Sequence, residues 1–250
     1  WLAVTTISFD IAALELYLPL ITGARMILAS KSESRDSAQL LARLNASQAT
    51  VMQATPSLWK LLVETGWEGR RGFKILCGGE ALSRQLADQL FDQSSSVWNL
   101  YGPTESTIWS TMAKVEEDDK PISIGRPVAN TQIYILDAHL QVAPIGIPGD
   151  LYIGGDGLAR GYLNRPELTS EKFVANPFNK NPNSQLYRTG DRAKYLADGN
   201  IDFLGRDDHQ VKIRGYRIEL GEIEAALVQH AEVKECVVIA SSFAPPRRGR

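Results

Sequence analysis

The stretch "FKILCGGEALSRQLADQLFDQSSSVWNLYGPTE" (73–105) decides the fold class of this chain. It begins with a short apolar strand (73–77) and continues with a helix (84–91), for which Ser83 is the predicted N-cap. A second apolar strand follows at 97–100. Strands and helices that alternate at this spacing are typical of parallel βαβ units.

The same alternation extends toward the N-terminus. Strands are predicted at 24–30 and 49–53, with a helix at 36–46 between them. A further helix is predicted from Pro56, because Thr55 is a good N-cap and proline suits the first helical turn. The first half of the chain is therefore predicted to be a parallel α/β unit.

Polar residues follow two of these strands. "GGE" (78–80) follows one, and "YGPTE" (101–105) follows the next. Ligands of open parallel sheets bind at the carboxyl ends of the strands, so an aromatic ring, a hydroxyl and a carboxylate at this edge indicate a binding site. Taken alone, 101–105 is equally compatible with an ordinary exit from a strand.

From about residue 122 the pattern changes to short strands separated by glycine and proline turns. Strands are predicted within 132–136, 150–155 and 193–206, and the Asp198-Gly199 pair indicates a hairpin inside the last of these. This region is predicted to be a small antiparallel, barrel-like β unit.

The last part of the chain predicts a hairpin (209–220), an amphipathic helix (221–230) and a strand (233–240). It would be the start of a separate small α+β domain. The predicted fold class is thus α/β plus β, with three regions: 1–121, 122–206 and 207–250.

Composition is that of an ordinary globular protein, with 250 residues, 44% hydrophobic and 22% charged. The net charge of −2, from 27 basic and 29 acidic residues, gives no reason to expect a nucleic-acid or membrane partner. Cys77 and Cys236 lie in apolar runs and are interpreted as buried free thiols. We expect a cytoplasmic protein. We also expect a piece of a longer one, because the chain starts inside a structured-looking segment and stops at "APPRRGR" (244–250).

Three further motifs are ambiguous when taken singly. "GGDGLARG" (154–161) lacks the Lys-Ser/Thr of a phosphate loop and favours a turn. Asp191 could be a simple turn carboxylate. The basic stretch "GRDDHQVKIRGYR" (205–217) is compatible with a solvated β face or with an anion site.

Taken together and in order, six motifs resemble the core motifs of the adenylation domains of non-ribosomal peptide synthetases, which are acyl-adenylate-forming ligases. The resemblance covers nearly all of residues 7–240. The motifs are "FDIAALE" (9–15), "GGE" (78–80), "NLYGPTE" (99–105), "GDLYIGGDGLARGYLNRPELT" (149–169), "YRTGD" (187–191) and "GRDDHQVKIRGYRIELGEIE" (205–224).

The resemblance implies an enzyme that forms an aminoacyl-adenylate from an amino acid and ATP with Mg²⁺. It then passes the acyl group to the phosphopantetheine thiol of a carrier protein. Peptidyl carrier and condensation domains in the same or an adjacent chain are the implied partners. The family's phosphate loop and its catalytic lysine match nothing in residues 1–250, so we expect the 250 residues alone not to adenylate.

The resemblance also assigns nucleotide contacts. Asp191 matches the carboxylate that binds the ribose hydroxyls, since its two oxygens can accept from two vicinal donors. Tyr101 matches the ring that packs on adenine, and Thr104 matches a phosphate-contacting hydroxyl. Glu105 matches a carboxylate ligand of Mg²⁺, a cation that prefers oxygen. The other implied nucleotide-binding residues are Gly79, Glu80, Asn99, Gly102 and Arg206.

Catalysis is implied for Thr104, Glu105, Arg206 and Lys212. Asp208 matches the hinge about which the small domain rotates between the two half-reactions, and Lys212 would then approach the site.

Nine positions match the family's amino-acid pocket: Asp10, Ile11, Leu14, Gln53, Leu76, Gly78, Leu100, Ile108 and Trp109. Asp10 matches the partner of the substrate α-ammonium group. The others are mostly large and apolar, and their pattern matches the family's glycine type. Glycine is therefore the expected substrate, with alanine or cysteine next. Ile11 and Leu14 could instead be ordinary helix packing.

Two alternatives remain. An acyl- or aryl-CoA ligase of the same fold would not need Asp10. A non-catalytic nucleotide-binding relic would have no reason to keep Asp191, Glu105 and Arg206.

Overall fold

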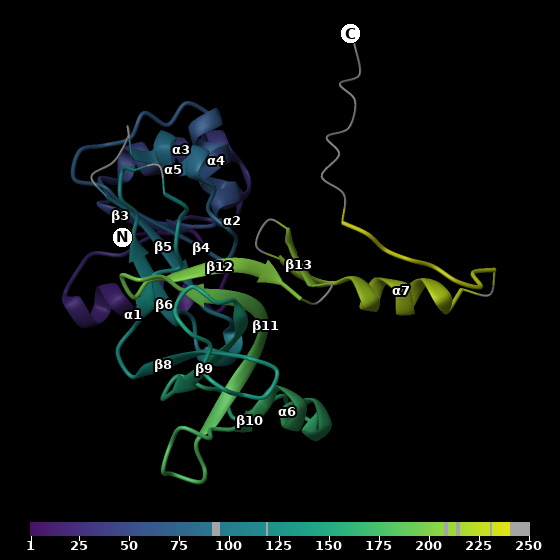
Figure 1. Ribbon diagram of the computed structural model, residues 1–250. Coiled ribbons are helices and arrows are strands. Elements are labelled where there is room, and N and C mark those ends of the chain that lie inside the picture. Colours follow the sequence, from purple (N-terminus) through teal and green to yellow (C-terminus); the bar gives the residue numbers. More distant parts are fainter. Residues whose placement is uncertain (92–95, 119, 208–209, 214–215, 231, 241–250) are drawn as a thin grey trace.

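The structure of the chain is a computed structural model that describes residues 1–91, 96–118, 120–207, 210–213, 216–230 and 232–240. The described residues form a seven-stranded sheet, a five-stranded sheet and a two-stranded hairpin (Figure 1).

The seven-stranded sheet has the order β2-β1-β3-β4-β5-β6-β7. Its strands are β1 (Leu2–Ala3), β2 (Ile27–Leu28), β3 (Val51–Ala54), β4 (Lys74–Gly78), β5 (Ser96–Tyr101), β6 (Thr111–Lys114) and β7 (Arg126–Pro127). The pairs from β2 to β5 are parallel, and β6 and β7 add antiparallel strands at one edge. The predicted parallel α/β unit is confirmed.

The helices of this unit are α1 (Ala12–Thr22), α2 (Lys31–Arg35), α3 (Ser37–Ser47), α4 (Pro56–Glu64) and α5 (Arg84–Phe91). Two predicted N-caps are present. Thr55 Oγ1 accepts from the Leu58 N–H at 3.3 Å, and Ser83 Oγ accepts from the Leu86 N–H at 3.2 Å. The sequence analysis missed α2, whose N-terminus is fixed by a capping box that Ser30 forms with Glu33.

An apolar core joins the helices to this sheet. Trp59, Trp67 and Phe73 form an aromatic group at its centre, with ring centroids 5.2–6.3 Å apart. Cys77 is fully buried in the same core, as expected of a free thiol, and burial raises the pKa of that thiol. Through Cys77 and Val97 this core packs against both β4 and β5.

The five-stranded sheet is antiparallel and contains β8 (Thr131–Leu136), β9 (Gly149–Gly155), β10 (Phe173–Ala175), β11 (Gln185–Tyr195) and β12 (Ile201–Arg206), with α6 (Pro166–Lys172) before β10. The predicted hairpin lies between β11 and β12. Its turn is stabilised by a hydrogen bond of 2.9 Å from the Asn200 N–H to Asp198 Oδ1. The predicted barrel-like unit is confirmed as an open antiparallel sheet.

The predicted C-terminal hairpin and helix are also present. β13 (Gln210–Ile213) pairs antiparallel with β14 (Tyr216–Glu219), and α7 (Leu220–Val228) extends away from the two large sheets (Figure 1). The strand predicted at 233–240 is wrong, because these residues form no strand in the described structure. An apolar run becomes a strand only with a neighbour for its backbone hydrogen bonds, and the described residues provide none here.

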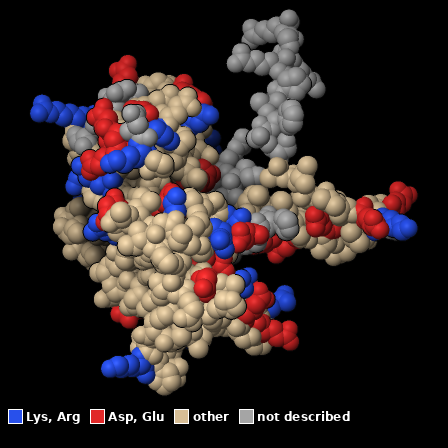
Figure 2. All heavy atoms as spheres, viewed as in Figure 1, with Lys and Arg blue, Asp and Glu red and all other residues tan. Residues whose placement is uncertain are grey.

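Acidic and basic side chains are interspersed on the face shown in Figure 2, in keeping with the small net charge of −2. Among the described helices, none has the length and apolar character needed to span a bilayer.

Candidate nucleotide and amino-acid site

A cavity of about 50 Å³ lies at the carboxyl ends of β4 and β5. It collects residues from both large sheets and from the loop before α1. The predicted site residues that line it are Ile11, Gly79, Tyr101, Gly102, Thr104, Trp109, Asp191 and Arg206. A larger and more open cavity of about 890 Å³ lies beside it and shares Phe9, Ile11 and Thr104. The smaller cavity is the better candidate site, because positions predicted to bind the nucleotide and positions predicted to bind the amino acid both line it.

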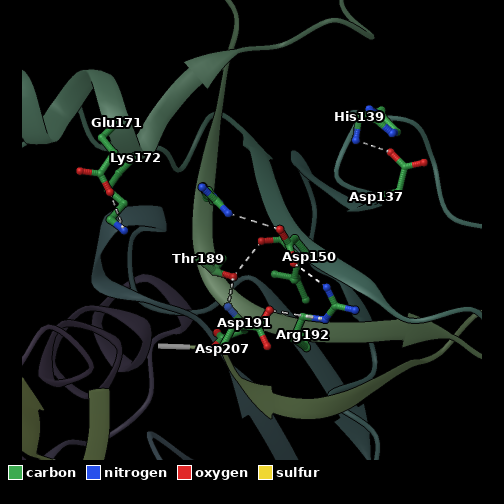
Figure 3. A network of polar contacts seen from close by, with 11 residues as sticks. Asp137, His139, Asp150, Glu171, Lys172, Thr189, Asp191, Arg192 and Asp207 are labelled. Atoms are coloured by element: carbon green, nitrogen blue, oxygen red, sulfur yellow. Dashed lines mark hydrogen bonds and ion pairs between the residues drawn. The ribbon is translucent and has the colours of Figure 1, made fainter. Parts of the chain in front are cut away.

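Asp191 is the centre of the polar side of this cavity. Its Oδ2 accepts a hydrogen bond from the Tyr101 hydroxyl, and its Oδ1 lies 2.7 Å from Arg206 Nη1. Arg206 Nη2 also donates to the Thr189 carbonyl at 3.1 Å. Thr189 Oγ1 accepts from the backbone N–H of Asp191 at 3.0 Å, which Figure 3 shows. The carboxylate is therefore held at both oxygens and through its backbone.

The backbone of β11 explains why this carboxylate reaches the cavity. The pairing of β11 with β9 shifts register between Arg188 and Arg192, and Gly190 within that bulge has φ 78°. Residues with a side chain rarely adopt this conformation, so glycine suits the position. Asp191 then pairs directly with Arg206 of β12.

Tyr101 remains a neutral hydrogen-bond donor. Burial raises the pKa of its phenol well above the usual value, and the neighbouring Asp191 carboxylate raises it further. Its ring packs on Phe203, with centroids 6.0 Å apart. The ring thus forms a fixed wall of the cavity.

Glu105 lies on the 3-10 helix Thr104–Ser106, which directly follows β5. Its carboxylate is buried, and its Oε1 accepts from the Tyr162 hydroxyl at 2.6 Å. Its backbone carbonyl accepts from the Ala159 N–H at 2.8 Å. The loop after β9 therefore orients Glu105. The sequence analysis quoted this loop but did not single out Tyr162, since nothing local to the motif connects it to Glu105.

Two side chains predicted to bind the nucleotide are not part of the lining of this cavity and form hydrogen bonds elsewhere. Glu80 Oε2 accepts from the Ser57 N–H at 3.0 Å and from Ser57 Oγ at 2.6 Å, at the N-terminus of α4. Asn99 Nδ2 donates to the Ser123 carbonyl at 2.9 Å. Their roles in nucleotide binding stay predictions.

Of the nine predicted amino-acid positions, Ile11 and Trp109 line the cavity. Six of the nine pack together in one hydrophobic cluster, namely Ile11, Leu14, Leu76, Leu100, Ile108 and Trp109. The indole of Trp109 is 9% exposed and lies against Gly78, where an added Cβ would come 2.2 Å from Trp109 Cη2. The ring thus occupies space that a side chain on Gly78 would need.

Asp10 carries an unusual carboxylate. Among the described residues, its Oδ2 is one of few buried side-chain polar atoms without a hydrogen-bond partner. A buried acceptor without a donor is costly, so the residue fits a role in binding a positively charged or hydrogen-bonding group.

The sequence analysis also missed Glu15, the last residue of the "FDIAALE" motif. It is fully buried on α1 and contacts Gln53, one of the predicted pocket residues, at 3.2 Å. Burial raises the pKa of its carboxyl, against the opposing effect of four hydrogen bonds that it accepts. An acidic residue inside an apolar helical run was the available signal.

Two predicted residues fall outside what the structure describes. Asp208, the predicted hinge, lies between described segments. Lys212 is placed by its backbone on β13, opposite Arg217, but its side chain is outside the description.

Comparison with known proteins identifies the family. The family model described as AMP-binding enzyme matches residues 1–163. The dimodular nonribosomal peptide synthase of Bacillus subtilis (strain 168) is 51% identical over 245 residues, which are 98% of this chain but 10% of that protein. The chain thus spans about a tenth of the length of this relative.

Two solved structures extend the comparison. Holo-AB3403, a four-domain nonribosomal peptide synthetase bound to AMP and glycine, is 46% identical, with a TM-score of 0.78 over 98% of this chain and 18% of that one. Holo-PA1221, with adenylation and PCP domains, is 32% identical, with a TM-score of 0.86 over 95% of this chain and 42% of that one. The chain belongs to the AMP-binding enzyme family, among the adenylation domains of non-ribosomal peptide synthetases.

Proposed function

We propose that this chain is part of an enzyme that activates glycine as glycyl-AMP from ATP and delivers it to the phosphopantetheine thiol of a carrier protein. The observation that carries the proposal is the cavity whose lining contains Asp191 and Arg206 together with the buried indole of Trp109. A nucleotide and a very small amino acid would meet between them.

On the nucleotide side, Asp191 would accept hydrogen bonds from the ribose hydroxyls, because a carboxylate has more lone pairs than Tyr101 and Arg206 use. Tyr101 would present its ring to adenine. Thr104 lines the same cavity and would contact phosphate.

Glu105 would be the protein's carboxylate ligand for Mg²⁺, which prefers oxygen ligands and commonly binds with one or two carboxylates and substrate phosphates. Mg²⁺ would supply charge stabilisation at the phosphates. Tyr162 would hold the carboxylate in orientation through its hydrogen bond of 2.6 Å.

On the amino-acid side, Asp10 would bind the α-ammonium group through its buried, unpartnered Oδ2. The described members of the cluster around Trp109 are apolar and could not pair with an ionic substrate side chain. Steric exclusion by a filled pocket rejects larger substrates effectively, and this favours glycine over alanine or cysteine. The structural relative that is bound to AMP and glycine supports the same choice.

Delivery to a carrier protein is proposed from the relatives, since holo-PA1221 contains an adenylation and a PCP domain. Arg206, Lys212 and the hinge Asp208 are proposed to act at the junction with the small domain. The three regions 1–121, 122–206 and 207–250 also stay predictions, as does the inactivity of the 250 residues alone. Pyrophosphate exchange by that chain well above a blank would contradict the last prediction.

The test is amino-acid-dependent ATP–pyrophosphate exchange with all twenty amino acids, in a protein that carries a complete adenylation domain around this segment. Glycine should give the highest rate, with alanine and cysteine next. A bulky or charged amino acid as the best substrate would refute the glycine assignment. A carboxylic acid without an amino group as the best substrate would favour the CoA-ligase alternative.

Binding of a non-hydrolysable ATP analogue addresses the relic alternative. The wild type should bind it clearly better than Asp191→Ala. Equally poor binding by both proteins would favour a relic.

A further inference from the structure

We propose that Glu15 is a positioning residue for amino-acid selection, acting through Gln53 on the indole of Trp109. The inference rests on the proposed function, because it assigns a determinant of selectivity to the same site. Glu15 itself belongs to neither the cavity lining nor the apolar cluster around Trp109.

The carboxylate of Glu15 is fixed from one side by the chain that leaves β1. Its Oε2 accepts from the backbone N–H groups of Val4 and Thr5 at 2.9 and 3.0 Å. Its Oε1 accepts from Thr5 Oγ1 at 2.7 Å. Three donors from one short segment leave the carboxylate little freedom to rotate.

The other partner of Oε1 is Gln53, at 3.2 Å from Gln53 Nε2. The same amide nitrogen donates to the Ile11 carbonyl at 3.0 Å. Gln53 is fully buried, and both hydrogens of its amide group are therefore directed at acceptors on or next to α1. The amide oxygen must then point the opposite way.

That oxygen accepts from Trp109 Nε1 at 2.9 Å. An indole has one N–H and no acceptor, so this bond fixes the rotation of the ring about its long axis. The ring lies over Gly78, at the apolar end of the proposed amino-acid pocket. The acceptor on Glu15 is thus linked through one amide to the wall that would exclude larger side chains.

The isosteric variant Glu15→Gln separates this role from simple packing. Its amide oxygen, in the place of Oε2, would accept from the backbone N–H groups of Val4 and Thr5, so its NH₂ group, in the place of Oε1, would face the Thr5 hydroxyl and the NH₂ group of Gln53. Two donors cannot share a hydrogen bond, so the Gln53 amide would keep the Ile11 carbonyl as its one remaining acceptor and would shift away from residue 15. The Gln53 oxygen that accepts from Trp109 Nε1 would shift with the amide, and the hydrogen bond to the indole would weaken.

The primary measurement is the ratio of kcat/KM for alanine to kcat/KM for glycine, by pyrophosphate exchange in the complete adenylation domain. Loss of one buried hydrogen bond changes an equilibrium or rate constant by about fivefold, so Glu15→Gln should raise this ratio of kcat/KM values by about the same factor. Leu44→Ala is the matched control, because Leu44 is also fully buried but lies in the other core, around Trp59. It should lower stability and leave the ratio unchanged.

A double-variant comparison tests the route through Gln53. In a Gln53→Leu background, where the amide is absent, Glu15→Gln should leave the ratio unchanged. A ratio that still changes by the same factor would overturn the proposed route.

A second readout does not depend on which amino acid is activated. The ¹⁹F NMR resonance of Trp109, labelled as 5-fluorotryptophan and assigned with Trp109→Phe, should shift in Glu15→Gln and stay in place in Leu44→Ala. If Glu15→Gln does not fold, Glu15→Asp replaces it, since the shorter carboxylate cannot reach both Gln53 and the Thr5 segment. An unshifted resonance in the folded variant overturns the inference. A wild type that prefers a large amino acid overturns the proposed function instead.

Discussion

The two ends of the cavity are built in different ways. At the proposed amino-acid end, the indole of Trp109 packs with six other apolar residues in one cluster. At the proposed nucleotide end, Asp191 accepts a hydrogen bond from Tyr101 and forms an ion pair with Arg206. Close packing defines a fixed shape that excludes ligands which are too large. Polar side chains, in contrast, can exchange their hydrogen-bond partners for groups of a ligand. One end is therefore suited to selection by exclusion and the other to reversible binding.

The largest expected effect concerns the packed end. Trp109→Ala should lower the free energy of unfolding of the chain by about 3–5 kcal/mol, because it removes a buried aromatic side chain and leaves a cavity. Urea denaturation measures this. Trp98→Ala is the control, since Trp98 is only half-buried on β5 and should cost less. An equal loss in both variants would contradict the packed-wall description.

The next effect concerns the polar end. Asp191→Asn should weaken binding of an ATP analogue by about tenfold to a hundredfold, because hydrogen bonds to a charged group contribute about 1.5–3 kcal/mol. Titration calorimetry on the complete adenylation domain measures it.

The matched control for this variant is Asp150→Asn. Asp150 lies on the same sheet and pairs with Arg192 at 2.9 Å, outside the cavity (Figure 3). It should leave the affinity unchanged. Equal weakening by both variants would show a general effect on the sheet and not a ribose contact.

A smaller effect is expected at Tyr162. Tyr162→Phe removes the hydroxyl that orients Glu105, and the Mg²⁺ concentration for half-maximal exchange should rise about fivefold. Tyr134→Phe is the control, since Tyr134 lies on β8 and its ring stacks on that of Phe178 with centroids 4.7 Å apart. An unchanged Mg²⁺ requirement in Tyr162→Phe would remove Tyr162 from the proposed metal site.

The smallest effect is a pH dependence at Tyr101. Because the pKa of its phenol is raised in the folded state, its contribution to stability is present below the unfolded value of about 10 and is lost as pH rises above it. The difference in unfolding free energy between wild type and Tyr101→Phe should shrink with rising pH in that range. A difference that stays constant across this pH range would contradict the buried Tyr101–Asp191 pair.

Much of the fold could be predicted because the signals were local. The caps Thr55 and Ser83, and the Asp198-Gly199 turn, act within a few residues of the chain. The error at 233–240 has the opposite cause, because a strand depends on a partner that no local pattern supplies.

The site could be predicted less completely, for a related reason. Asp191, Tyr101 and Trp109 stand in motifs that resemble a known family, although Tyr101 and Asp191 meet across 90 positions. The contacts of Tyr162 with Glu105 and of Gln53 with Glu15 span 57 and 38 positions. Only the folded arrangement of the two sheets and α1 shows that these pairs touch.

The central claim is that the indole of Trp109 excludes amino acids larger than glycine. The most direct test is pyrophosphate exchange with glycine and alanine in wild type and Trp109→Ala, both as complete adenylation domains. Removing the ring should raise the alanine-to-glycine ratio of kcat/KM by about tenfold or more, since one methyl group in a pocket is worth about 1–3 kcal/mol. An unchanged ratio in a folded, active Trp109→Ala protein would contradict the claim.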